Sequence, residues 1–148
     1  MLSRAGRYTK LQSMECKFYH QKDETEENLF FECQYATVIW EDFQKEWGIK
    51  LEMTGMELCL TSLTKLKQSR NTRGVLYALI NAVTYYICKA RNHLVFKNQT
   101  LTPQQILHEA REQITQRILH LHHYKHNYNT CIDFIYSRQV RLGHPRAH

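Results

Sequence analysis

The sequence predicts an all-α fold of about four helices that follow an irregular N-terminal knuckle, residues 13–34. Only five Gly and two Pro occur in 148 residues, too few for an all-β fold, which needs a turn about every ten residues. Apolar residues instead recur three and four positions apart, which places them on one face of an α-helix. Because 43% of the residues are hydrophobic, the chain can bury one ordinary core. We therefore expect a single domain, residues 13–136, between a flexible basic arm, residues 1–12, and a basic tail, residues 137–148.

The knuckle leads into the first predicted helix, residues 35–47. Just before this helix, Leu29, Phe30 and Phe31 form a run of three apolar residues, which we expect to point inward. Within the helix, large apolar residues follow the spacing of one helix face. They are Ala36, Ile39, Trp40, Phe43 and Trp47. Gly48 comes next, and glycine suits the left-handed position that ends many helices.

A second, short helix is predicted at about residues 55–66. Thr54 and Glu57 form a capping-box pattern, because a Thr followed three positions later by a Glu can satisfy free N–H groups at a helix start. Residues 65–73 then read KLKQSRNTR, which we expect to be a basic, polar connector. The ordinary interpretation of such a run is a solvated loop, and the functional one is contact with phosphate.

The third predicted helix, about residues 73–97, has the most regular apolar pattern of the chain. Its apolar residues step alternately by four and three positions, as one continuous seam. The seam consists of Leu76, Ile80, Val83, Ile87, Ala90 and Leu94. So wide an apolar face belongs in the core, and we expect it to pack against Trp40 and Phe43 of the first helix.

The fourth predicted helix covers about residues 103–126. Thr102 at the cap, Pro103 in the first turn and Gln105 three positions after the cap make a well-defined helix start. The side chains that we expect to face outward are Arg111, Gln113 and Arg117. Histidines crowd the end of this helix, and His122 shares a face with His126, but two histidines without a third ligand are a weak metal pattern.

Charge divides the chain into two halves. Residues 1–57 hold 7 Lys and Arg against 11 Asp and Glu, a net charge of −4, whereas residues 58–148 hold 13 against 3, a net charge of +10. A basic half of this size suits a protein that faces phosphate. The alternative is that the basic residues only solvate helix faces.

Motifs of catalysis and of targeting do not occur in the sequence. It contains no Gly-rich phosphate loop, no Gly-x-Ser-x-Gly and no His-Glu-x-x-His, and we therefore expect a protein that is not an enzyme. It also lacks a run of about 18 apolar residues that could span a bilayer. We expect no membrane partner and an intracellular location, in the nucleus or the cytoplasm. The five cysteines are irregularly spaced, which argues against a disulfide framework.

Residues 26–40, EENLFFECQYATVIW, resemble the zinc-binding segment found downstream of the polymerase in reverse transcriptases of LINE-type (non-LTR) retrotransposons. The family pattern is Cys-x2-Cys, an acidic loop, Glu-His-Leu-Phe-Phe-x-Cys, and a helix of the form Ala-x-x-x-Trp. The positions kept in this sequence are Cys16, Glu27, Leu29, Phe30, Phe31, Cys33, Ala36 and Trp40. A second match, Arg91-Asn92 followed by Phe96, lies at the end of the third predicted helix. The resemblance covers roughly residues 16–114 and implies a binding module rather than an enzyme.

The resemblance also implies a zinc site, but two of its four ligand positions differ. Asn28 stands in place of the ligand histidine, and Tyr19 stands in place of the second cysteine. Neither residue is an ordinary zinc ligand. The remaining candidates are Cys16, His20 and Cys33, which are fewer than the four donors of structural zinc. The alternative is a metal-free knuckle in which the two cysteines are small buried residues, and we expect no other cofactor.

Basic residues of the second half are the candidate nucleic-acid contacts, and we expect RNA or a single strand as the partner. Lys, Arg and His suit contacts to phosphates and bases. The candidates are Lys65, Lys67, Arg70, Arg73, Lys89, Arg91, His122 and Lys125. A second hypothesis is a protein-interaction module that forms a homo-oligomer through a partly exposed seam between Leu76 and Leu94. A third is a retroelement remnant without a selected function.

Overall fold

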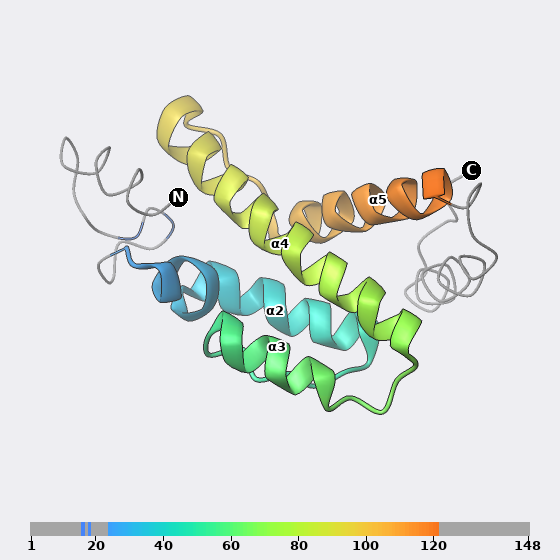
Figure 1. Cartoon of the computed structure of the whole chain (residues 1–148). Helices are drawn as coiled ribbons and strands as arrows, with labels where there is room; N and C mark the ends of the chain where they lie inside the picture. The colour runs from blue at the N-terminus through green and yellow to red at the C-terminus, as the bar shows by residue number, and fades with distance from the viewer. Residues whose placement is uncertain (1–15, 17, 19–23, 122–148) are drawn as a thin grey trace.

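The computed structural model of the chain describes Cys16, Phe18 and residues 24–121 (Figure 1). Its elements, in order, are η1 (Asn28–Glu32), α2 (Gln34–Trp47), α3 (Met56–Thr64), α4 (Arg70–Lys97) and α5 (Pro103–Leu121). Every element in this part of the chain is helical, which confirms the all-α class. The predicted arm, residues 1–12, and the predicted tail, residues 137–148, lie outside the described residues.

The longest helix, α4, organises the packing. It runs obliquely across the molecule from the end of α3 towards η1 (Figure 1) and packs against both of them. Its most extensive contact, however, is with α5, which also packs against α2. We expected the seam of α4 to pack against Trp40 and Phe43 of α2, but the main partner of α4 is α5.

The apolar seam of α4 is buried in the core. From Leu76 to Ala90 its members are at most 1% exposed, and only Leu94 at its end is half-buried. Burial this complete leaves no seam for a second subunit. The expectation that this seam is partly exposed is therefore wrong.

The knuckle is closed by aromatic packing onto α2. Leu29, Phe30 and Phe31 are all buried, as expected. They lie in a single π-helical turn, η1, whose last hydrogen bond runs from Cys33 N–H to the carbonyl of residue 28 at 2.8 Å. Trp40 joins the turn to α2, because its Nε1–H donates to the Phe30 carbonyl at 2.6 Å and its ring stacks on Phe31.

Two predicted helix ends are confirmed. Gly48 ends α2 with φ 62° and ψ 39°, the left-handed conformation that glycine adopts at little cost. At the start of α5, Thr102 and Gln105 form the expected capping box: Gln105 N–H donates to Thr102 Oγ1 at 3.1 Å, and Thr102 N–H donates to Gln105 Oε1 at 2.8 Å.

Two other helix starts differ from the expectation. α3 begins at Met56 after Gly55, without a side-chain cap, so the capping box predicted from Thr54 is wrong. α4 begins at Arg70 rather than at residue 73, because Ser69 Oγ accepts a hydrogen bond from Thr72 N–H at 3.1 Å and caps the helix. The basic connector is therefore shortened, and its last residues form the first turn of α4.

Candidate nucleic-acid interface

The connector between α3 and α4 presents three exposed basic side chains, Lys65, Lys67 and Arg70. Arg73, one turn into α4, is half-buried, and its Nη1 donates to the carbonyl of Leu66 at 3.4 Å. Arg73 thus closes the connector against the helix. The first three side chains remain available to a ligand.

The first turn of α4 is an unfavourable place for these charges. It contains Arg70 and Arg73 and no acidic residue, although the positive end of the helix macrodipole lies there. Helix stability therefore does not account for this placement. An anion would meet both the dipole and the guanidinium groups.

Lys89 lies near the other end of α4 and is exposed. Its Nζ lies 5.5 Å from the centroid of the Tyr86 ring, a distance typical of a cation–π contact. Arg70 and Lys89 are 19 positions apart, about 28 Å along the helix at 1.5 Å per residue. The two cations therefore mark the two ends of an extended surface.

The position of Arg91 contradicts the prediction that it contacts nucleic acid. Its side chain is 3% exposed, and its guanidinium pairs with Glu24, whose Oε1 lies 2.9 Å from Nε and 2.8 Å from Nη2. The pair joins α4 to the segment that leads into η1. The prediction that Arg91 contacts a phosphate is therefore wrong, because the guanidinium lies inside the protein.

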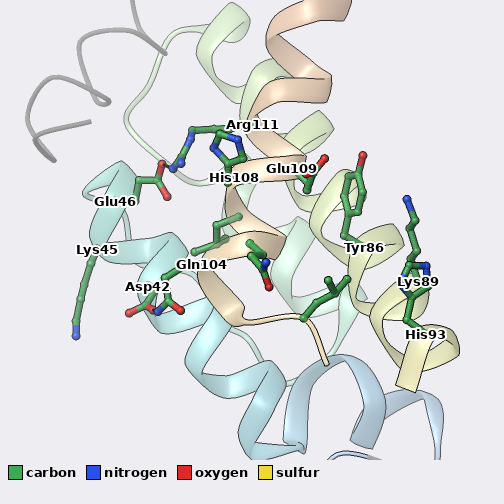
Figure 2. A pocket seen from close by; sticks show the side chains of 13 residues that line it. Asp42, Lys45, Glu46, Tyr86, Lys89, His93, Gln104, His108, Glu109 and Arg111 are labelled. Atoms are coloured by element: carbon green, nitrogen blue, oxygen red, sulfur yellow. Dashed lines mark hydrogen bonds and ion pairs between the residues drawn. The ribbon is translucent and has the colours of Figure 1, made fainter. Parts of the chain in front are cut away.

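Arg111 of α5 has the same role on the other side of the molecule. We expected it to face outward, but it is buried and forms an ion pair with Glu46 of α2 (Figure 2). Burial lowers the pKa of the Arg111 guanidinium, and the carboxylate of Glu112 acts in the opposite direction. Buried arginines of this kind hold elements together and do not reach a ligand.

Carboxylates do not occur between Glu57 and Glu109. This stretch, residues 58–108, contains all of α4 and the connector before it. The exposed cations of this surface therefore have no acidic neighbour in the same stretch of chain. This feature distinguishes the surface from ordinary solvated helix faces, which mix both signs of charge.

The candidate zinc ligands are only partly brought together. The thiols of Cys16 and Cys33 are buried and hydrogen-bonded, with their Sγ atoms 3.4 Å apart. The contact with Cys16 and the burial both raise the pKa of the Cys33 thiol. His20 lies outside the described residues. Within the part of the chain that the structure describes, no third His, Cys, Asp or Glu joins the two thiols.

Asn28, in the position of the family histidine, does not complete the site. It is 4% exposed, and its Oδ1 has no hydrogen-bond partner among the described residues. Two thiols and a carboxamide fall short of the four thiolate or imidazole donors of structural zinc. The described residues thus do not fit a complete zinc site, whereas the aromatic contacts of Trp40 close the knuckle directly.

A trough of about 840 Å³ lies between α2, α4 and α5 (Figure 2). Its charged lining is mixed: Asp42, Glu46 and Glu109 face Lys45, Lys89 and Arg111. Because the signs balance, the trough does not favour a phosphate chain. Of the predicted nucleic-acid contacts that lie within the described residues, only Lys89 lines the trough.

The last two predicted contacts, His122 and Lys125, lie outside the described residues.

Comparison of the chain with known proteins gives no match to a family model, to a curated protein or to a solved structure. Within the described residues, none of the helices combines the length and the apolar character needed to cross a membrane.

Sequence reasoning missed the acidic partners of the buried arginines. Glu24 and Glu46 lie 67 and 65 positions before the arginines that they neutralise. No local pattern indicates such a pairing. The acid-free stretch, by contrast, is visible in the sequence and defines the candidate surface better than the total charge does.

Proposed function

We propose that this chain is a non-catalytic module that binds RNA or single-stranded nucleic acid through phosphate contacts. The contacts come from Lys65, Lys67 and Arg70 at the α3–α4 connector and from Lys89 further along α4. The observation that carries the proposal is the set of exposed cations on a stretch of 51 residues, 58–108, without a carboxylate. Phosphate contacts of this kind supply most of the affinity of proteins that bind without sequence preference.

The resemblance to the C-terminal region of LINE-type reverse transcriptases supports the same proposal. The matching residues in the knuckle are mostly buried and serve the fold, whereas at the end of α4 Arg91 is buried and Asn92 and Phe96 are exposed. A module derived from such a protein would keep its helical framework without polymerase or endonuclease parts. We therefore propose an origin in, or a likeness to, that region, and an intracellular place of action.

The proposal is tested by the salt dependence of binding. Each phosphate neutralised on a single strand contributes about −0.7 to the slope of log K against log salt concentration. Four contacts predict a slope of about −2.8 by that rule. We would measure the fluorescence anisotropy of labelled 12-nucleotide oligo(U) and oligo(dT) over a range of salt concentrations. Replacing Lys65, Lys67 and Arg70 together with Gln should flatten the slope by about two units.

A matched control removes three other exposed positive charges, by Lys45→Gln, Lys50→Gln and Arg117→Gln. The control lowers the net charge equally but should leave the slope within about half a unit of the parent, because no phosphate contact is lost. Equal flattening by both triple variants would mean that net charge alone attracts the ligand. Absence of binding below about 100 μM at physiological salt, the weak end of non-specific affinity, would refute the proposal.

A further inference from the structure

Three large aromatic side chains of α4 are exposed: Tyr77 is 51% exposed, Tyr85 58% and Phe96 61%. Tyr77 and Tyr85 lie between Arg70 and Lys89 in the sequence, whereas Phe96 lies beyond Lys89. Single exposed aromatic residues are common on protein surfaces. Two on one helix face, between two exposed cations, call for an explanation.

The spacing places these residues in one row, a stripe along α4. Tyr77, Asn81 and Tyr85 follow each other at intervals of four, and Arg70 and Lys89 continue the line at its ends. At about 100° per residue, neighbouring members of the stripe differ by about 20° to 40° around the helix, and the stripe winds by about 120° from Tyr77 to Lys89. The two tyrosines lie about 12 Å apart along the axis, farther than the 3.4 Å between stacked bases. They would therefore meet two separate bases.

The surroundings hold Tyr85 in place and keep the stripe basic. The Tyr85 ring packs edge-on against Tyr86, with centroids 5.1 Å apart and an interplanar angle of 80°. Helix α4 itself has no acidic residue. Two carboxylates approach it from other elements. Glu24 is paired with Arg91 inside the protein, and Glu109 faces Tyr86, whose pKa is raised mainly by burial and secondarily by that carboxylate.

Charge also decides between two occupants of the stripe. If a second copy packed antiparallel through Tyr77 and Tyr85, Arg70 and Lys89 would lie near the basic residues of its partner. If the second copy packed parallel, Arg70 and Lys89 would each lie near the same residue of that copy. No carboxylate of α4 would offset either contact. A strand of nucleic acid supplies both the anions for the cations and the flat faces for the tyrosines.

We propose that Tyr77 and Tyr85 are stacking platforms for two unpaired bases of a strand whose phosphates meet Arg70 and Lys89. This inference rests on the proposed function and narrows it, because bases within a duplex cannot stack on a side chain. In this arrangement the two tyrosines contact the bases and the cations contact the phosphates. Stacking of this kind tolerates any sequence, since every base has a π-face.

The test compares Tyr77→Ser, Tyr85→Ser and the double variant with the matched Tyr→Phe changes. Serine and tyrosine have similar helix propensities, and both positions are exposed, so α4 should persist and circular dichroism should stay unchanged. The probes are a 12-nucleotide oligo(dT), a 12-nucleotide strand with abasic sites throughout, and a 12-base-pair duplex. All three carry the phosphate charge, and only the first offers unpaired bases.

We expect each Ser substitution to weaken oligo(dT) binding by on the order of tenfold, within the range measured for aromatic–base stacking. The salt slope should not change, because no phosphate contact is removed. The Phe variants should bind within about threefold of the parent, since the ring is kept. The abasic strand and the duplex should bind more weakly than oligo(dT) and should not respond to the Ser substitutions.

Three results would overturn the inference. Salt-dependent binding that is equally tight for oligo(dT) and for the abasic strand, and unchanged in the Ser variants, would remove the stacking role and leave the phosphate contacts standing. A dimer in sedimentation that the Ser variants dissociate without loss of oligo(dT) affinity would assign the stripe to a second copy. Failure of all three probes to bind would remove the proposed function and this inference together.

Discussion

Two pairs of basic residues in the same protein have opposite surroundings. Arg91 and Arg111 are buried, and each is neutralised by a glutamate from the first 46 residues of the chain. Arg70 and Lys89 are exposed on α4 and have no acidic partner on that helix. The difference shows that a charge count along the sequence combines two kinds of cation, those that pair with carboxylates inside the protein and those that face the solvent.

Burial explains why the two kinds behave differently. A charge taken out of water must be paired and hydrogen-bonded, so a buried arginine needs its own carboxylate. Two carboxylates of the acidic first half, those of Glu24 and Glu46, therefore neutralise buried arginines of the basic half. The exposed cations of α4 have no carboxylate on that helix.

The first prediction concerns the buried ion pair of Arg91 and Glu24. Arg91→Met removes the partner of Glu24 and leaves a buried carboxylate unpaired, so the free energy of unfolding should fall by about 3 to 5 kcal/mol. Chemical denaturation followed by circular dichroism measures this loss. Arg70→Met, the matched exposed change, should stay within about 0.5 kcal/mol of the parent.

A double variant sharpens the result. Adding Glu24→Gln to Arg91→Met removes the stranded charge and should recover part of the lost stability. Equal stabilities for Arg91→Met, Arg70→Met and the parent would mean that the Arg91 side chain is solvated. The distinction between buried and exposed cations would then fail.

Trp40 provides a comparison with an uncharged contact. Trp40→Ala should cost about 3 to 5 kcal/mol, because a side chain that is 1% exposed leaves a cavity in the packing between η1 and α2. Trp40→Phe keeps an aromatic ring but loses the hydrogen bond to the Phe30 carbonyl and should cost less. Thermal unfolding of the three proteins tests this order. A Trp40→Ala protein as stable as the parent would contradict the packing of the knuckle.

Much of this fold could be predicted from the sequence, because its signals are local. The seam from Leu76 to Ala90, the glycine that ends α2 and the capping box of α5 each depend on residues within a few positions of one another. The start of α4 differs from the prediction because Ser69 caps the helix within the basic connector. This cap is also a local signal, since it depends on Ser69 and Thr72 alone.

The burial of Arg91 and Arg111 could not be predicted in the same way. On a helix, an arginine at the edge of an apolar face looks the same whether it reaches the solvent or a distant glutamate. Only the packing of α4 and α5 brings Glu24 and Glu46 to these side chains. The stripe of Tyr77 and Tyr85 was missed for a related reason, because tyrosines can belong to either face of an amphipathic helix.

The smallest effect is expected from metal removal. Because the described residues supply two thiols and no third donor, we predict substoichiometric zinc in the purified protein and no loss of helix in a chelator. Elemental analysis and circular dichroism with and without chelator measure both quantities. One tightly held zinc per chain, with unfolding when it is removed, would show that the knuckle depends on metal rather than on the packing of Trp40.

We propose that the exposed cations of α4 contact nucleic acid and that the buried ones do not, and NMR of the arginine side chains can distinguish the two. Each arginine has an Nε–H group whose signal can be followed while 12-nucleotide oligo(dT) is added. We predict that the Arg70 signal shifts with increasing ligand, whereas those of Arg91 and Arg111 keep their positions and exchange slowly with water. Shifts at Arg91 or Arg111 together with an unchanged Arg70 would contradict it.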